Sequence, residues 1–91
     1  PGHDPARAPI ILMAHQDVVP VTPGTESDWR HGPFDGVIDE GSVWGRGSVD
    51  NKSSLIALFE AIEALAVDGF APAASVIVLS GHDEEAGDGH T

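Results

Sequence analysis

The sequence has no cysteine, and only four of its 91 residues are basic. Without cysteine there is no disulfide framework, thiolate metal site or cysteine nucleophile, and the redox compartment is unreadable. Four bases against fifteen acids give a formal net charge of -11, which excludes a basic nucleic-acid footprint and attraction to anionic membranes. No apolar run approaches the roughly 20 residues of a membrane-spanning helix. No charged-then-apolar stretch at the start resembles a signal peptide, so a soluble, cytoplasmic protein is favoured, with a mature exported form as the alternative.

What the sequence does contain is enough apolar residues, 41 %, for the core of one small domain or of a piece of a larger one. Two short apolar runs, at 10–14 and 75–79, predict strands buried on both faces. Between them, apolar residues spaced by three and four predict a helix over about 51–67, which Gly69 and Pro72 end. The apolar face of this helix consists of Leu55, Leu58, Phe59, Ile62 and Leu65.

The segment between the first strand and the helix predicts a long loop followed by a hairpin. Three prolines and two glycines over 20–35 indicate the loop, and the apolar pairs within 37–44 flank a turn on Gly41. The large side chains expected to pin the loop to the core are Trp29, Phe34 and Trp44. Arg46 is expected to pair with one of the nearby carboxylates.

The order strand, helix, strand predicts an α/β fold with a largely parallel sheet, a right-handed crossover helix and a hairpin. Ligands of open parallel sheets bind beyond the carboxyl ends of the strands. Three segments reach that edge, namely residues 15–17, the loop that ends at Asp50, and residues 83–85. The densest His and carboxylate groups therefore converge there, which acids scattered only for solubility would not do.

Imidazole and carboxylates without thiolates are ligands for Zn²⁺, Mn²⁺ or Co²⁺ rather than for a structural zinc site. His15 and Asp17 share a face of an extended chain, so one can ligate while the other holds it in place. Asp50, on a glycine-flanked loop, can bridge two ions. Glu84 and Glu85 are adjacent and are expected to point apart, one towards a metal and one towards a bound water. Two metals roughly 3.5–4 Å apart with a carboxylate base beside the shared water form a hydrolytic centre.

Each of these residues also has a plainer interpretation. His15 fits an ordinary hydrogen-bonded histidine at a strand end. Asp50 fits a cap of the following helix, and the glutamate pair fits a solvated acidic turn. His82 and His90 fit loop histidines better than metal ligands.

Three ordered motifs resemble the M20 family of dinuclear zinc peptidases, most closely its carboxypeptidase S-like branch, which includes N-acyl amino acid hydrolases. The motifs are MAHQDVVPV at 13–21, WGRGSVDNK at 44–52 and GHDEE at 81–85. The resemblance implies two Zn²⁺ ions per complete site, with Co²⁺ or Mn²⁺ as substitutes. It implies that His15 binds one zinc, Asp50 bridges both and Glu85 binds the second.

The same resemblance implies roles for two further side chains. Glu84 would be the general base and acid, and Asp17 would orient the histidine ligand. The peptide bond between Asp50 and Asn51 would be cis. Lys52 matches the lysine of the motif but receives no role.

The chain also departs from the family pattern. The family usually follows its glutamate pair with two glycines, whereas Gly87 is followed by Asp88. The family also has a further carboxylate ligand, a histidine ligand far along the chain, and an inserted domain for substrate binding and dimerisation. His90 is too close to the glutamate pair to be that histidine. We therefore interpret residues 1–91 as the incomplete N-terminal part of an M20-like catalytic domain. Alone it should bind zinc weakly and not turn over, and the full-length protein should be a homodimer.

The expected activity of that protein is metal-dependent hydrolysis of an amide bond next to a free carboxylate, as in a carboxypeptidase. The alternatives are an N-acyl amino acid hydrolase or deacylase of the same family, a non-catalytic metal-binding module, and a plain acidic scaffold. The expected partner is a small peptide or N-acyl amino acid, with no nucleic acid and no membrane. Glu84 favours an enzyme because a binding module needs no base beside its metal.

Overall fold

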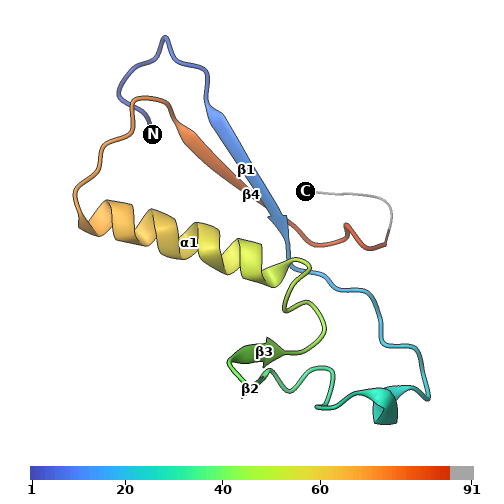
Figure 1. Ribbon diagram of the computed structural model, residues 1–91. Coiled ribbons are helices and arrows are strands. Elements are labelled where there is room, and N and C mark those ends of the chain that lie inside the picture. Colours follow the sequence, from blue (N-terminus) through green and yellow to red (C-terminus); the bar gives the residue numbers. More distant parts are fainter. Residues whose placement is uncertain (87–91) are drawn as a thin grey trace.

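The computed structural model describes residues 1–86, which form an open arrangement of strands around one α-helix (Figure 1). In chain order the elements are β1 (Ile10–His15), the 3-10 helix η1 (Glu26–Asp28), β2 (Val37–Asp39), β3 (Ser42–Trp44), α1 (Lys52–Val67) and β4 (Val76–Gly81). No helix in this described part is long and apolar enough to cross a membrane.

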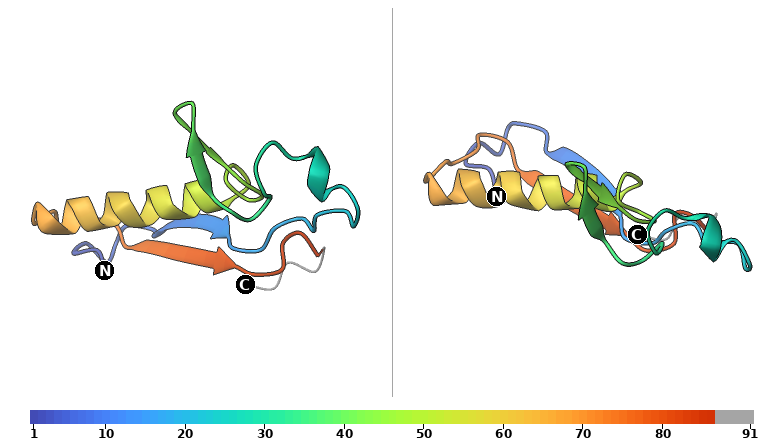
Figure 2. Two further views of the ribbon diagram at one scale, coloured as in Figure 1. Left: turned by 90° about the horizontal axis from the view of Figure 1, so that it is seen from below. Right: turned by 60° about the horizontal axis from the view of Figure 1, so that its bottom comes forward.

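The two apolar runs form the expected parallel pair. β1 lies beside β4, with Ile10 opposite Val76 and His15 opposite Gly81. The connection between them passes through the hairpin and α1, and α1 lies along one face of the pair (Figure 2). This arrangement confirms the predicted α/β class and parallel crossover.

The helix has nearly the bounds that its apolar spacing predicts. It ends where Gly69 adopts a left-handed conformation, with a φ of 71°. There the amide of Phe70 donates to the carbonyl of Leu65 at 2.9 Å, which satisfies a carbonyl that the helix itself leaves free. The predicted glycine stop is therefore confirmed.

The prediction that both strands are buried on both faces is wrong for this chain. Ala14 and His15 are the only buried residues of β1, and Met13 is 62 % exposed. The physical reason is that α1 covers one face of the pair only, and within residues 1–86 nothing covers the other (Figure 2). The apolar face of α1 is likewise incompletely covered, since Phe59, Ile62 and Leu65 are exposed.

The hairpin forms as predicted, but the large loop side chains do not pin the loop to a core. β2 and β3 pair antiparallel around Gly41, which has a φ of 74°. Phe34 is 68 % exposed. Trp44 lies under the guanidinium of Arg30, whose Cζ is 5.0 Å from the ring centroid. The two tryptophans, Trp29 and Trp44, instead stack with arginine side chains, and Phe34 stays exposed.

A second local correction concerns Arg46. Within residues 1–86 it forms no ion pair with a carboxylate, and its Cζ lies 5.1 Å from the ring centroid of Trp29. The carboxylates of the hairpin are engaged by another cation, since Arg30 contacts Asp39 at 2.9 Å and Glu40 at 3.0 Å.

The overall shape is a thin slab of 54 × 33 × 11 Å. Its radius of gyration is 17.1 Å, whereas a compact domain of this length would have about 12 Å. The strands and the helix therefore form a layer with large open faces, and the site described next lies at one edge of that layer.

Candidate metal centre

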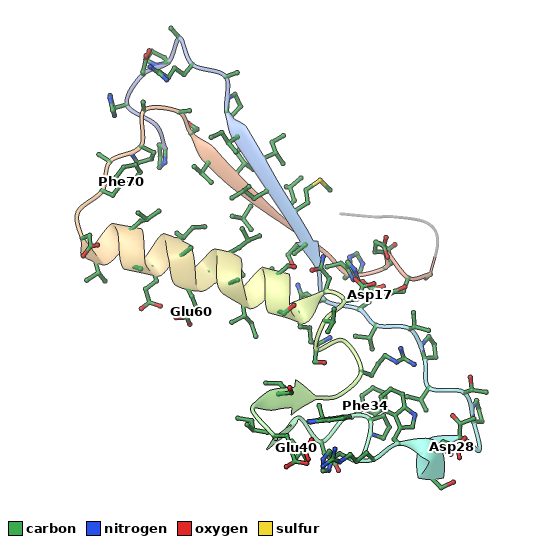
Figure 3. The ribbon with its side chains drawn as sticks, viewed as in Figure 1. Asp17, Asp28, Phe34, Glu40, Glu60 and Phe70 are labelled. Atoms are coloured by element: carbon green, nitrogen blue, oxygen red, sulfur yellow. The ribbon has the colours of Figure 1, made fainter. Side chains whose placement is uncertain are left out.

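Three segments far apart in the sequence meet where β1 and β4 end. The parallel register sets His15 opposite Gly81, so the turn that follows β4 begins beside the end of β1. The loop between β3 and α1 reaches the same place, as Figure 3 shows around the labelled Asp17. The predicted convergence of the three polar segments is therefore what the fold produces.

His15 is at the centre of this meeting point. Its residue is only 7 % exposed, in a chain where few side chains are buried. Ring atom Nδ1 lies 3.1 Å from the carbonyl oxygen of Asp17, and Nε2 lies 3.1 Å from Oδ1 of Asp50. Both partners accept hydrogen bonds only, so the ring satisfies both when both nitrogens carry protons.

These neighbours change the acidity of the imidazole. Burial lowers the pKa of His15, but the Asp17 carbonyl, the hydrogen bond to Asp50 and the charge of Glu84 together outweigh it. The pKa therefore lies above the ordinary value of 6.5. These neighbours therefore favour the protonated, positively charged form of the ring.

Asp17 joins two of the three segments. Its Oδ2 accepts the backbone N–H of Glu85 at 2.8 Å, and its Oδ1 lies 3.4 Å from Nδ1 of His15. Burial raises the pKa of Asp17, but the backbone N–H groups of Glu85 and Glu84 outweigh that effect and leave the pKa below its usual range. The carboxylate thus stays ionised and contacts one ligand candidate while anchoring the turn that carries the other two.

The two glutamates do not point apart as expected. One carboxylate oxygen of each, together with one ring nitrogen of His15, forms a group whose members all lie within 4.8 Å of one another. The reason is that residues 84–86 form a turn, closed by an Ala86 N–H to Asp83 carbonyl bond of 3.3 Å. Alternation of side chains applies to an extended strand and not to this turn.

Asp50 reaches the site from the loop before α1. Its side chain is 75 % exposed and contacts the histidine rather than capping the helix, whose N-cap is Asn51. The peptide bond between Asp50 and Asn51 is cis, as the family resemblance implies. The capping interpretation of Asp50 is therefore not supported.

Lys52 also lies at this edge, and the sequence analysis assigns it no role. Its ammonium donates to the carbonyl of Gln16, and its backbone N–H donates to Gly47 at 3.1 Å. Gly47 has a φ of 80°, and a Cβ there would collide with Val18. Nothing in the local pattern shows this contact, because Gln16 and Lys52 are 36 residues apart.

The donor set suits a divalent metal. One imidazole nitrogen and the carboxylates of Asp50, Glu84 and Glu85 match the nitrogen and oxygen ligands of catalytic zinc. Asp17 provides the outer hydrogen-bond partner that a metal-bound histidine needs on its second nitrogen. His82 is exposed and stands outside this group, and His90 lies outside the described residues.

The sequence of this chain is similar to those of known proteins. The model of peptidase family M20/M25/M40 matches residues 11–91. The chain is 54 % identical to carboxypeptidase S of Saccharomyces cerevisiae over 87 residues, which cover 93 % of this chain and 15 % of the yeast protein. It is 43 % identical to the N-fatty-acyl-amino acid synthase/hydrolase PM20D1 of Mus musculus, over 92 % of this chain and 16 % of the mouse protein.

A third relative, probable carboxypeptidase S-like 2 of Dictyostelium discoideum, is 44 % identical over 94 % of this chain. In all three cases the chain spans about 15 or 16 % of the relative's length. The similarity therefore concerns the segment that forms this edge of the sheet.

Proposed function

The chain belongs to peptidase family M20/M25/M40, and from this membership we propose that the full-length protein is a metal-dependent hydrolase of amide bonds next to a free carboxylate. We further propose that residues 1–91 are the N-terminal part of its catalytic domain and that this part alone is inactive. The exposed faces of the β1–β4 pair and of α1 support the second proposal, because a folded domain covers such apolar surfaces.

One observation carries the functional proposal. Three separate segments bring His15, Asp50 and the Glu84-Glu85 pair into contact, around an imidazole that is the most buried polar group described. A solubilising surface spreads its acids apart to reduce repulsion. Here the acids crowd together, which a bound cation would stabilise.

The proposed assignment gives each side chain one task. His15 and Glu85 would each hold one metal ion, and Asp50 would be a ligand shared by both. Asp17 contacts Nδ1 of His15 and is not assigned as a metal ligand. Bound zinc would supply Lewis-acid chemistry, making water a nucleophile near neutral pH and polarising the substrate carbonyl.

Glu84 is the proposed general base and acid. Its carboxylate is 61 % exposed and its Oε2 lies 3.8 Å from Nε2 of His15, so it borders the ligands and remains accessible to substrate and water. It would take a proton from the attacking water and pass the proton to the leaving amine. A carboxylate in this role typically contributes 10²–10⁴-fold to the rate.

Two substrate classes fit this proposal. The name of the yeast relative supports a peptide whose C-terminal residue is released. The name of the mouse relative supports an N-acyl amino acid instead. Both classes present an amide bond adjacent to a free carboxylate, and we place the peptide first because several relatives are named as carboxypeptidases.

The test uses the full-length protein loaded with zinc. Blocked dipeptides and N-acyl amino acids are assayed as free acids and as their C-terminal amides. We expect hydrolysis of the free acids, and we expect Glu84→Gln to lower kcat at least 100-fold without loss of zinc. Glu60→Gln is the matched control, because Glu60 is an exposed acid on α1 away from the site (Figure 3).

The outcomes separate the candidates. Zinc binding without hydrolysis of any amide would favour the non-catalytic metal-binding module. Absence of zinc binding would refute both and leave the acidic scaffold. Hydrolysis of acyl amino acids without hydrolysis of peptides would favour the alternative substrate class.

A further inference from the structure

Lys52 is a polar residue at the sheet edge that the proposed chemistry leaves unused. Of the four basic residues, Arg7 and Arg30 form ion pairs with carboxylates. Lys52 instead gives its ammonium to a neutral backbone carbonyl, that of Gln16. In a chain with fifteen acids and four bases, this cation thus contacts a main-chain carbonyl and, within residues 1–86, no carboxylate.

The position of Lys52 also runs against helix preference. It is the first residue of α1, whose first turn contains no acidic residue. A positive charge at that end opposes the helix macrodipole, which favours anions there. Residues that contradict local preference are found most often where function requires them.

The contact between Lys52 and Gln16 links two segments that carry proposed metal ligands. Gln16 stands between His15 and Asp17 in the chain, and Lys52 follows Asp50 by two residues. The ammonium-to-carbonyl bond therefore ties the end of β1 to the loop before α1. Opposite it, Nε2 of His15 meets Oδ1 of Asp50 at 3.1 Å.

The loop before α1 also contacts Lys52 directly. The backbone N–H of Lys52 donates to the carbonyl of Gly47 at 3.1 Å. A Cβ on Gly47 would lie 3.4 Å from Nζ of Lys52 and would collide with Val18. The loop therefore packs closely at this glycine against Val18, beside the lysine side chain that reaches Gln16.

We propose that Lys52 is a positioning residue that sets the separation of His15 and Asp50 and thereby the affinity of the site for metal. This inference rests on the proposed function, because it assumes that both side chains bind metal. Lys52 itself touches neither substrate nor metal. It holds two ligands, contributed by segments 35 residues apart, at a spacing that an ion can bridge.

The experiment measures zinc affinity of the full-length protein by competition with a chromophoric chelator. Lys52→Met removes the ammonium and keeps the aliphatic stem. We expect its zinc dissociation constant to rise about 10–100-fold, the usual effect of losing an outer-shell partner. Lys52→Arg keeps a cationic donor and should recover most of the affinity.

Ser53→Ala is the matched control. The Ser53 hydroxyl donates to the Val49 carbonyl at 3.0 Å, so it also ties α1 to the preceding loop, but without reaching β1. We expect this variant to bind zinc like the wild type. The absorption spectrum of the Co²⁺-loaded protein gives a second readout, because it reports ligand geometry and should change in Lys52→Met only.

The results divide cleanly. Unchanged zinc affinity in Lys52→Met, whatever its melting temperature, would overturn the proposal and leave the lysine a merely structural role. Equal weakening in Lys52→Met and Ser53→Ala would overturn it too. If Lys52→Met does not fold, Lys52→Gln replaces it under the same criteria. If the wild type binds no zinc, the proposed function fails, whereas zinc binding with the same affinity by the wild type and every variant refutes only the role of Lys52.

Discussion

Substitution of Asp17 is the sharpest test of how the site is held together. The carboxylate accepts the Glu85 N–H at 2.8 Å through Oδ2, and its Oδ1 lies 3.4 Å from Nδ1 of His15. Its removal therefore disturbs two proposed ligands on two different segments. We compare Asp17→Ala, which removes both contacts, with Asp17→Asn, which keeps an oxygen for the Glu85 amide.

The expected loss of zinc affinity follows from those two contacts. Loss of one outer-shell partner typically lowers metal affinity 10–100-fold. Asp17→Asn should lower zinc affinity by about 10-fold, the lower limit of this range, because it keeps the acceptor for the Glu85 N–H and loses only the charge beside the histidine. Asp17→Ala should lie near the upper limit, about 100-fold, because it also leaves the Glu85 N–H without its acceptor.

The assay is zinc competition on the full-length protein, with the melting temperature of the metal-free form measured in parallel. Glu60→Gln serves as the control for loss of one negative charge, since Glu60 is exposed on α1. Zinc affinity in Asp17→Ala equal to that of the wild type would refute the reasoning. Equal losses in the two Asp17 variants would refute the separate role given to the Glu85 contact.

Four further predictions concern the acidity of His15, the pH dependence of zinc affinity, the backbone at Gly47 and the need for metal. In the metal-free protein, NMR titration of His15 should give a midpoint above 6.5, because its pKa is raised in the folded state. The protonated ring therefore stabilises the folded state below pH 6.5, and this stabilisation is lost as the pH rises through the folded pKa. Zinc affinity should correspondingly fall as the pH drops through the same midpoint, since the metal needs the neutral ring. Gly47→Ala should lower the melting temperature more than Gly24→Ala, because both have positive φ but a Cβ at Gly24 meets nothing within 4 Å. Chelation of metal should abolish hydrolysis, and added zinc should restore it; activity that survives a chelator would contradict the metal assignment.

The elements of the fold could be predicted because their signals are local. The spacing of Leu55, Leu58 and Ile62 defines the helix, and Gly69 defines its end. The order of the elements then implies the parallel pair and brings His15 to the same edge as the glutamate pair. Each of these steps needs only neighbouring residues and general rules of chain connection.

What could not be predicted depends on contacts between distant residues. Burial of the strands fails because only one face of β1 and β4 is covered in this part of the chain. The role of Lys52 depends on a carbonyl 36 residues away. The convergence of Glu84 and Glu85 depends on the turn at 84–86, which the adjacency of the two residues does not reveal. The stacking of Arg46 on Trp29 joins residues 17 positions apart, which no local pattern shows.

The register of β1 against β4 has a consequence for the order in which the protein forms. His15 and Gly81 become neighbours only after the 65 residues between them have been made and α1 has folded back. Such non-local pairing is slow, because closure of the long loop must precede the contacts that reward it. The ligands of the proposed centre therefore come together only after this whole stretch of chain has been made, and a metal ion that binds them stabilises the completed pair over every earlier intermediate.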